Sequence, residues 1–158
     1  MWFVFFALVV FLADRITKFF AYKYLYGKAV MVIPGFFRLV YAENKGAAFS
    51  LFASFSGFSR VFFLILIPVV VVAIIIYFLL RRNLAFSEKL ALSLILGGAV
   101  GNLYDRIVYG KVIDFVDFHL GNYHWPAFNV ADVAVFVGTL ILLSGYFLKN
   151  SKKDSVIQ

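Results

Sequence analysis

Residues 61–80 read VFFLILIPVVVVAIIIYFLL, a run of twenty positions without one charged side chain. A helix needs about 20 mainly apolar residues to cross the hydrocarbon core of a bilayer. Three other stretches of similar length carry few charges, at residues 2–21, 90–107 and 128–148. The sequence therefore predicts an all-α membrane protein with four transmembrane helices. We expect its 158 residues to form a single integral membrane domain.

The composition of the chain agrees with a membrane protein. Hydrophobic residues make up 64% and charged residues 15%, whereas soluble proteins average about 45–50% and 25%. These values exclude a soluble enzyme, a disordered protein and a secreted disulfide scaffold. The chain has no Cys, so disulfides, thiol nucleophiles and Cys metal sites are impossible. The first fifteen residues lack a basic n-region and an A-x-A-like cleavage site, which predicts a retained span.

The basic residues indicate the orientation of the spans. The net charge is +7, but the Lys and Arg residues are scattered between apolar spans, so we expect contact with phospholipid and no nucleic acid. Basic residues are densest near residues 81–89 and 149–153. This density predicts cytoplasmic termini, although the first span alone, with basic residues only after it, favours the opposite orientation.

The two segments on the other side predict a small β-containing region. Residues 22–60 are apolar but are broken by Pro34, Gly35, Gly46 and Gly57. Within them, residues 36–41 are rich in aromatic and aliphatic side chains, which favours short strands at the membrane surface. Residues 108–127 show a similar mixture. We expect both segments to be extracytoplasmic loops.

Polar residues within the spans gather at one depth. With a rise of about 1.5 Å per helical residue, nearly every ionisable residue of the spans falls in their outer halves. The polar residues at this depth include Asp14, Asn102, Asp105, Arg106, Asn129 and Asp132. Because charges in lipid are costly, such a cluster predicts a functional site, here at the outer membrane–water boundary.

Most of these features also have a purely structural interpretation. Asp14 and Lys18 are i,i+4 neighbours that could neutralise each other. Arg106 could extend toward the interface or pair with Asp105 or another carboxylate. Gly97-x-x-x-Gly101 is a common close-packing motif of membrane helices.

Residues 44–50, the aromatic residues and the two histidines also have structural interpretations that need no functional site. Residues 44–50 could form a simple turn, and the many aromatic side chains could face lipid. His119 and His124 lack a convincing ligand set, so we expect no metal site.

Two acidic residues are harder to explain structurally. Asp132 lies at the start of an otherwise uncharged span, and Asp114 lies a short loop away. Two close carboxylates share a proton, so one can accept a proton from water while the other donates one to a scissile carbonyl. Asp117 is an alternative partner for Asp132 on spacing alone.

Five sequence blocks, in order along almost the whole chain, resemble the lipoprotein signal peptidases (signal peptidase II). The blocks are Asp14-Arg15-Ile16-Thr17-Lys18, Asn44-Lys45-Gly46-Ala47-Ala48-Phe49-Ser50, Gly97-Gly98-Ala99-Val100-Gly101-Asn102-Leu103-Tyr104-Asp105-Arg106, Val112-Ile113-Asp114-Phe115 and Phe128-Asn129-Val130-Ala131-Asp132. The chain departs from the family pattern at Val133, where Ser is usual, and at Arg15, where Gln is frequent. Neither difference removes a carboxylate.

The resemblance implies an intramembrane aspartyl endopeptidase of the bacterial inner membrane. Its substrates would be diacylglyceryl-modified prolipoproteins, cut before the lipidated Cys, and globomycin-type inhibitors would occupy the same site. It implies Asp114 and Asp132 as the catalytic pair, and thus Asp114 over Asp117. Residues that line or order the substrate site would be Asn44, Gly46, Asn102, Arg106 and Asn129. Structural support would come from Asp14, Lys18 and Asp105. No cofactor or metal is implied, and we expect a monomer.

Other functions predict different patterns. A small proton- or ion-coupled transporter could use Asp14, Asp105 and Asp132 as a relay, but would need carboxylates at several depths. A membrane assembly or chaperone subunit would not need Asp114 and Asp132 together. A serine peptidase could pair Ser50 with Lys45.

Overall fold

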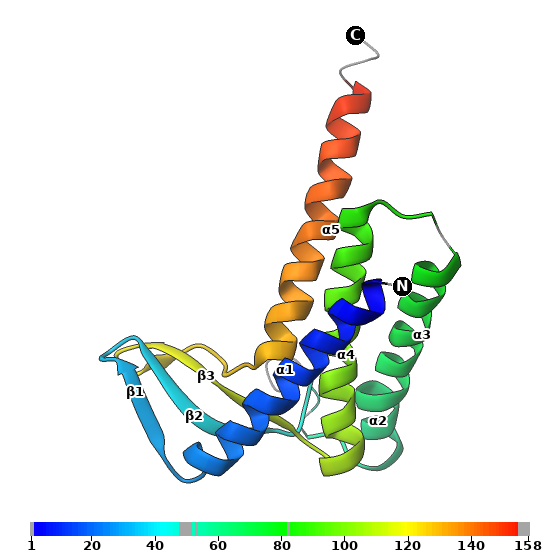
Figure 1. The fold of residues 1–158 in the computed structure, drawn as a ribbon. Coiled ribbons are helices and arrows are strands. Elements are labelled where there is room, and N and C mark those ends of the chain that lie inside the picture. The colour runs from blue at the N-terminus through cyan, green and yellow to red at the C-terminus, as the bar shows by residue number, and fades with distance from the viewer. Residues whose placement is uncertain (1, 48–51, 53, 82, 155–158) are drawn as a thin grey trace.

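The computed structural model describes residues 2–47, 52, 54–81 and 83–154. Most of the chain is helical, with one small antiparallel sheet (Figure 1). The helical elements are α1 (Trp2–Leu25), α2 (Gly57–Val61), the π-helical turn η2 (Phe62–Leu66), α3 (Ile67–Arg81), α4 (Phe86–Tyr109) and α5 (Val130–Asp154). The strands are β1 (Ala29–Ile33), β2 (Phe37–Asn44), β3 (Val112–Leu120) and β4 (Tyr123–His124).

The sheet confirms the strands expected in both connecting segments. Its order is β1-β2-β3-β4, and each strand runs antiparallel to its neighbour. The pairing of β2 with β3 shifts register between Leu39 and Ala42, after which Ala42 lies opposite Asp114. The sheet extends from the end of the helices that lies away from the C-terminus (Figure 1).

Close contacts around α4 explain the glycine motif of the sequence. Helix α4 packs against α1, α3 and α5. A Cβ atom at Gly97 would lie 2.5 Å from the carbonyl oxygen of Ala7 in α1, and a Cβ atom at Gly98 would overlap the carbonyl oxygen of Ala131 in α5. The predicted close-packing role of the glycines is therefore confirmed.

The outer surfaces of the helices are apolar. Large side chains such as Phe5, Phe19, Phe136 and Phe147 are more than half exposed. Within the described chain, two helical stretches are long and apolar enough to cross a membrane, Gly57–Arg81 and Val130–Leu148.

Helix α1 has a different pattern, because its buried residues recur every three or four positions. They are Val10, Asp14, Lys18, Ala21 and Leu25. This buried stripe includes two charged side chains, which face the interior of the protein.

Helix α5 extends beyond the expected fourth span. It begins at Val130 and continues through Asp154, so residues 149–154 of the predicted polar tail are helical. This segment contains no Gly or Pro to end the helix. At the other end, Asn129 precedes the first helical turn instead of lying within it.

Candidate active site

The beginning of α5 is closed by a reciprocal pair of hydrogen bonds. The backbone N–H of Asp132 donates to Oδ1 of Asn129 at 3.0 Å, and the backbone N–H of Asn129 donates to Oδ2 of Asp132 at 3.2 Å. Asn129 is the N-cap and Asp132 the third helical residue, so the two form a capping box. The helix terminus thereby fixes the position of the Asp132 carboxylate.

The side chain of Asn129 also reaches Asp114 in β3. Its Nδ2 donates to Oδ1 of Asp114 at 2.6 Å, while Nδ2 of Asn44 donates to Oδ2 of the same carboxylate at 3.1 Å. Asn129 is fully buried and Asp114 is 3% exposed. One asparagine therefore contacts both Asp114 and Asp132, which are eighteen positions apart in the sequence.

The surroundings of Asp114 favour its protonated form. Burial raises the pKa of Asp114 to about 6, and the negative charge of Asp132 adds to this effect. The hydrogen bonds from Asn44 and Asn129 act in the opposite direction, because they stabilise the ionised carboxylate. A carboxyl group with such a pKa can be either acid or base near neutral pH.

Asn102 of α4 connects this pair to the buried charges. Its Nδ2 donates to Oδ1 of Asp132 at 2.8 Å. Its Oδ1 accepts hydrogen bonds from Nζ of Lys18 at 2.8 Å and from Nδ2 of Asn129 at 3.2 Å. The ammonium group of Lys18 therefore fixes which way the Asn102 amide points.

Lys18 lies in a buried ion-pair cluster. Its Nζ is 2.9 Å from Asp14 and 2.7 Å from Asp105, and all three side chains are at most 2% exposed. Asp14 also accepts a hydrogen bond from the backbone N–H of Ala131 at 3.1 Å. The cluster therefore links α1 and α4 to the first turn of α5.

Arg15 is a member of this cluster that the sequence did not single out as a site residue. Its guanidinium lies 2.6 Å from Asp105, 3.2 Å from Asp14 and 4.9 Å from the centre of the Tyr104 ring. It supplies a second cation for the two buried carboxylates. Its adjacency to Asp14 in sequence gives no indication of the contact with Asp105, which depends on how α1 packs on α4.

Arg106 of α4 binds the loop after β2 and holds it beside Asn102. Its guanidinium donates to the carbonyl oxygens of Gly46 at 3.0 Å and Asn102 at 3.4 Å. Oδ1 of Asn44 accepts the backbone N–H of Gly46 at 2.9 Å. Among the described residues, the expected pairing of Arg106 with Asp105 is not found, because the Asp105 carboxylate binds Arg15 and Lys18. The contact of Arg106 with the loop carbonyl was not expected from the sequence. The rest of that sequence block, residues 48–50 with Ser50, lies outside the described residues.

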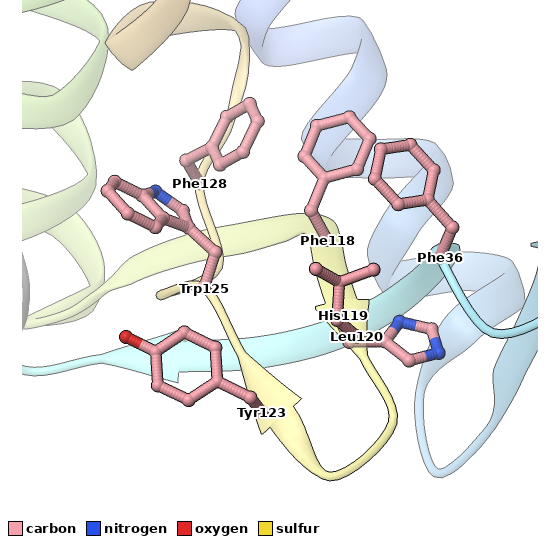
Figure 2. A pocket seen from close by; sticks show the side chains of 7 residues that line it. All are labelled: Phe36, Phe118, His119, Leu120, Tyr123, Trp125 and Phe128. Carbon is pink, nitrogen blue, oxygen red and sulfur yellow. The ribbon is translucent and has the colours of Figure 1, made fainter.

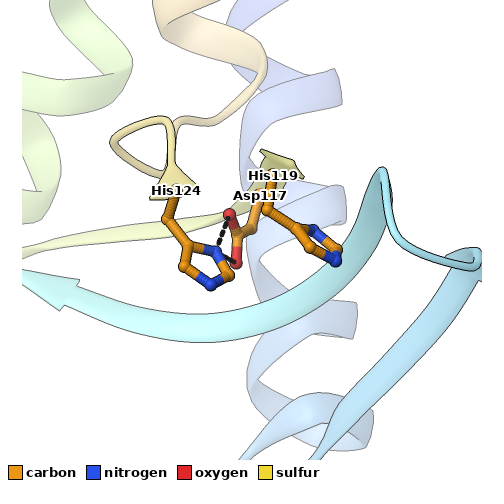
Figure 3. A group of neighbouring side chains, drawn as sticks. All are labelled: Asp117, His119 and His124. Atoms are coloured by element: carbon orange, nitrogen blue, oxygen red, sulfur yellow. Dashed lines mark hydrogen bonds and ion pairs between the residues drawn. The ribbon is translucent and has the colours of Figure 1, made fainter. Parts of the chain in front are cut away.

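Asp117, the alternative partner for Asp132, has other neighbours. Its carboxylate lies 2.6 Å from Nε of Arg38. It also lies 3.0 Å from Nδ1 of His124 (Figure 3). Burial alone would raise the pKa of Asp117, but its hydrogen bonds with His124 and Arg38 lower the pKa below its usual range. Asp114 and Asp117 therefore lie in two separate polar clusters on the same strand.

Comparison with known proteins assigns the chain and its fold to one family. A family model described as signal peptidase (SPase) II matches residues 6–148. The chain belongs to the signal peptidase II family. The resemblance predicted from the five sequence blocks is thus confirmed, and the chain is a protease.

Curated relatives of signal peptidase II are similar over most of the chain. The lipoprotein signal peptidase of Cupriavidus taiwanensis is 49% identical over 139 residues, which cover 87% of this chain and 78% of that protein. The lipoprotein signal peptidase of Sulfurihydrogenibium sp. (strain YO3AOP1) is 43% identical over 147 residues, which cover 92% of this chain and 90% of the relative.

Solved structures extend this similarity to the fold. One structure of a bacterial membrane enzyme superposes with a TM-score of 0.81 at 28% identity, covering 96% of this chain and 90% of that one. A second bacterial membrane enzyme gives a TM-score of 0.76 at 29% identity, with 91% of each chain covered. The signal peptidase II fold described above is therefore that of a membrane protein.

The geometry suits the chemistry that a peptidase performs. Hydrolysis of an amide needs a base to activate water and an acid to protonate the substrate. Asp114 supplies a buried carboxyl group and Asp132 a half-buried one, and Asn129 joins the two. Asn44 and Asn102 supply further donors. The fold brings together all five residues expected to line the site, with the three supporting residues directly behind them.

Proposed function

We propose that the chain is an aspartyl endopeptidase that removes the signal peptide from diacylglyceryl-modified prolipoproteins. The cut falls immediately before the lipid-carrying Cys. The observation that carries this proposal is the contact of Asn129 with both Asp114 and Asp132. Family membership supports it, since the curated relatives are lipoprotein signal peptidases.

The two carboxyl groups act as a pair that shares one proton. The ionised carboxylate accepts a proton from a water molecule, whose oxygen attacks the scissile carbonyl carbon. The protonated carboxyl group donates its proton to the carbonyl oxygen, which gives a neutral gem-diol. Collapse of the gem-diol breaks the C–N bond, returns one proton to the pair and delivers another to the leaving amine.

The neighbouring residues position this pair and the substrate. Asn44, Asn102 and Asn129 hold the carboxylates through amide hydrogen bonds. Arg106 holds the loop at Gly46, whose backbone lines the substrate site. Asp14, Lys18 and Asp105 support the arrangement through buried ion pairs. The mechanism uses no cofactor.

The proposed membrane arrangement has four transmembrane helices, formed by α1, the helical segment 57–81, α4 and α5. The bacterial inner membrane holds the monomer with its termini in the cytoplasm, and the active site lies near the outer leaflet. Asp132 at the beginning of α5 and Asn102 near the end of α4 support this depth, because both lie close to the sheet end of the helices. The lipid-modified substrate enters sideways from the phospholipid, and globomycin-type inhibitors occupy the same site.

The proposal is tested by identifying the product. The purified protein in detergent is incubated with a precursor before and after transfer of the diacylglyceryl group to its Cys. We expect cleavage of the lipidated precursor only, and mass spectrometry should give a product that begins with the modified Cys. Equal cleavage of the unmodified precursor, or a cut elsewhere, would contradict the proposed substrate and position.

A further inference from the structure

A second cluster of potential ligands lies at the far end of β3. Asp117 and His119 are two positions apart, so their side chains share a face of the strand. The register of the β3–β4 hairpin places His124 directly opposite His119. His119 therefore has His124 as its cross-strand neighbour and Asp117 as its i,i−2 neighbour on the same face. Figure 3 shows the three side chains as neighbours.

The potential ligand atoms of these residues are close together. One nitrogen of each histidine and a carboxylate oxygen of Asp117 all lie within 4.8 Å of one another. Nδ1 of His124 is 3.0 Å from Oδ1 and 3.1 Å from Oδ2 of Asp117. The His119 and His124 rings stack with their centres 5.0 Å apart.

His119 gives an independent indication of a ligand. His119 is buried, with 8% of its surface exposed. Among the described residues, Nδ1 of His119 has no hydrogen-bond partner. A buried polar nitrogen without a partner is costly, and coordination of a cation would satisfy it.

We propose that Asp117, His119 and His124 form a binding site for a divalent transition-metal ion of the zinc class. Two imidazoles and one carboxylate are suitable ligands for Zn²⁺ and leave a fourth position for water. Bond lengths of about 2.0–2.2 Å in a tetrahedral site separate ligand atoms by about 3.3–3.6 Å. The 3.0 Å between His124 and Asp117 is close to this spacing, so an ion can replace the proton between them after rotation of His119.

Arg38 contacts two of the three proposed ligands. Its Nε donates to Oδ2 of Asp117 at 2.6 Å, and its Nη2 lies 3.4 Å from Nδ1 of His124. Oδ1 of Asp117 is left directed at His124, and the guanidinium must move away from Nδ1 of His124 for a metal ion to bind there. Groups that hydrogen-bond a ligating carboxylate orient it toward the metal. The positive charge of Arg38 opposes cation binding.

An adjacent pocket provides the surroundings that such an ion needs. A pocket of about 410 Å³ is lined by His119 together with mainly aromatic side chains (Figure 2). These are Phe36, Phe118, Leu120, Tyr123, Trp125 and Phe128. Apolar walls strengthen metal–ligand interactions by excluding water, and the pocket gives access to His119.

The test measures metal binding to the full chain purified in detergent, with a non-histidine affinity tag because His119 and His124 are its only histidines. After EDTA treatment, Zn²⁺ is titrated by calorimetry, and Co²⁺ is followed by its visible absorption. We expect one ion per chain and the intense bands of four-coordinate Co²⁺. Asp117→Asn, His119→Phe and His124→Gln should each weaken binding by at least about tenfold.

Glu43→Gln is the matched control. Glu43 is an acid of the same sheet, paired with Lys111 at 2.5 Å and remote from both histidines, so its variant should bind Zn²⁺ as the parent does. His124 is exposed, so His124→Gln tests the site even where a change at buried His119 prevents folding. Equal Zn²⁺ affinity of the parent and His124→Gln would overturn the proposal and leave Asp117–His124 as a simple hydrogen-bonded pair.

Discussion

Nδ2 of Asn129 lies 2.6 Å from Oδ1 of Asp114. The same asparagine caps α5 in a reciprocal pair with Asp132. A helix terminus and a strand are thereby joined by one side chain, and the two carboxyl groups proposed to cleave the substrate are positioned by it. Since Asn129 is fully buried, its contacts are shielded from competing water.

Replacement of Asn129 separates its two roles. Asn129→Ser keeps an N-cap oxygen for α5 but removes the amide that donates to Asp114. We expect kcat to fall by about a hundredfold or more, as on loss of one positioned donor at an active site, with little change in the unfolding temperature. Asn129→Ala, which removes the N-cap oxygen as well, should lower both kcat and the unfolding temperature. Unchanged kcat in Asn129→Ser would show that the amide has no role in positioning Asp114.

The pH dependence of cleavage should reflect Asp114. Burial and the charge of Asp132 raise the pKa of Asp114 to about 6, so the shared proton is lost as the pH rises above this value. Cleavage rates measured across pH should therefore fall on the alkaline side. Asn44→Ala removes a hydrogen bond that lowers the pKa of Asp114. The alkaline limb should consequently move to higher pH in this variant, and a shift to lower pH would contradict the assignment.

Arg106 offers a test of the loop at Gly46. Arg106→Ala removes the bond to the Gly46 carbonyl, so we expect a raised KM and weaker cleavage with the fold intact. Arg60→Ala is a suitable control, because Arg60 also donates to a backbone carbonyl, that of Gly110, away from the carboxylates. Equal rates in parent and Arg106→Ala would remove Arg106 from the substrate site.

The packing of α4 on α5 predicts that alanine substitutions at two glycines, Gly98 and Gly145, change the stability of the protein very differently. A Cβ at Gly98 would overlap the backbone of Ala131, whereas a Cβ at Gly145 of α5 would meet nothing within 4 Å. Gly98→Ala should destabilise the protein by about 1–3 kcal/mol. Gly145→Ala should be neutral or stabilise it by up to about 1 kcal/mol, because alanine favours helix. Thermal unfolding in detergent measures both changes, and similar stabilities would contradict the close approach.

Periodicity and composition predicted much of the architecture. The uncharged run at residues 61–80 predicted a long apolar helix, and the helix found there is Gly57–Arg81. Aromatic and aliphatic residues around 36–41 predicted a strand, now β2. The spacing of Asp14 and Lys18 predicted their ion pair, which is 2.9 Å long. These three features depend only on residues that are close in the sequence, so they can be predicted from it directly.

The choice between Asp114 and Asp117 could not be made from spacing. It depends on which face of β3 each side chain occupies, and the β2–β3 pairing contains a register shift. The contact of Arg15 with Asp105 is likewise set by helix packing. By contrast, the helix start has a local signal, because Asn129 precedes an apolar run, as N-cap residues do.

The cluster of Asp117, His119 and His124 also had a sequence signal. Gly121-Asn122 separates two strand-like segments, a pair typical of a two-residue hairpin turn, and Gly121 has a φ of +58°. Such a turn places His119 opposite His124. Without that register the two histidines show no common ligand set, which is why spacing alone predicts no metal site.

Cleavage by single-carboxylate variants tests the central claim most directly. Asp114→Asn and Asp132→Asn, each made alone, are compared with the parent on a lipidated precursor by gel shift, with thermal unfolding to show that the variants remain folded. The account predicts that either change lowers cleavage by at least about a thousandfold. Normal processing of the precursor by either folded variant would contradict it.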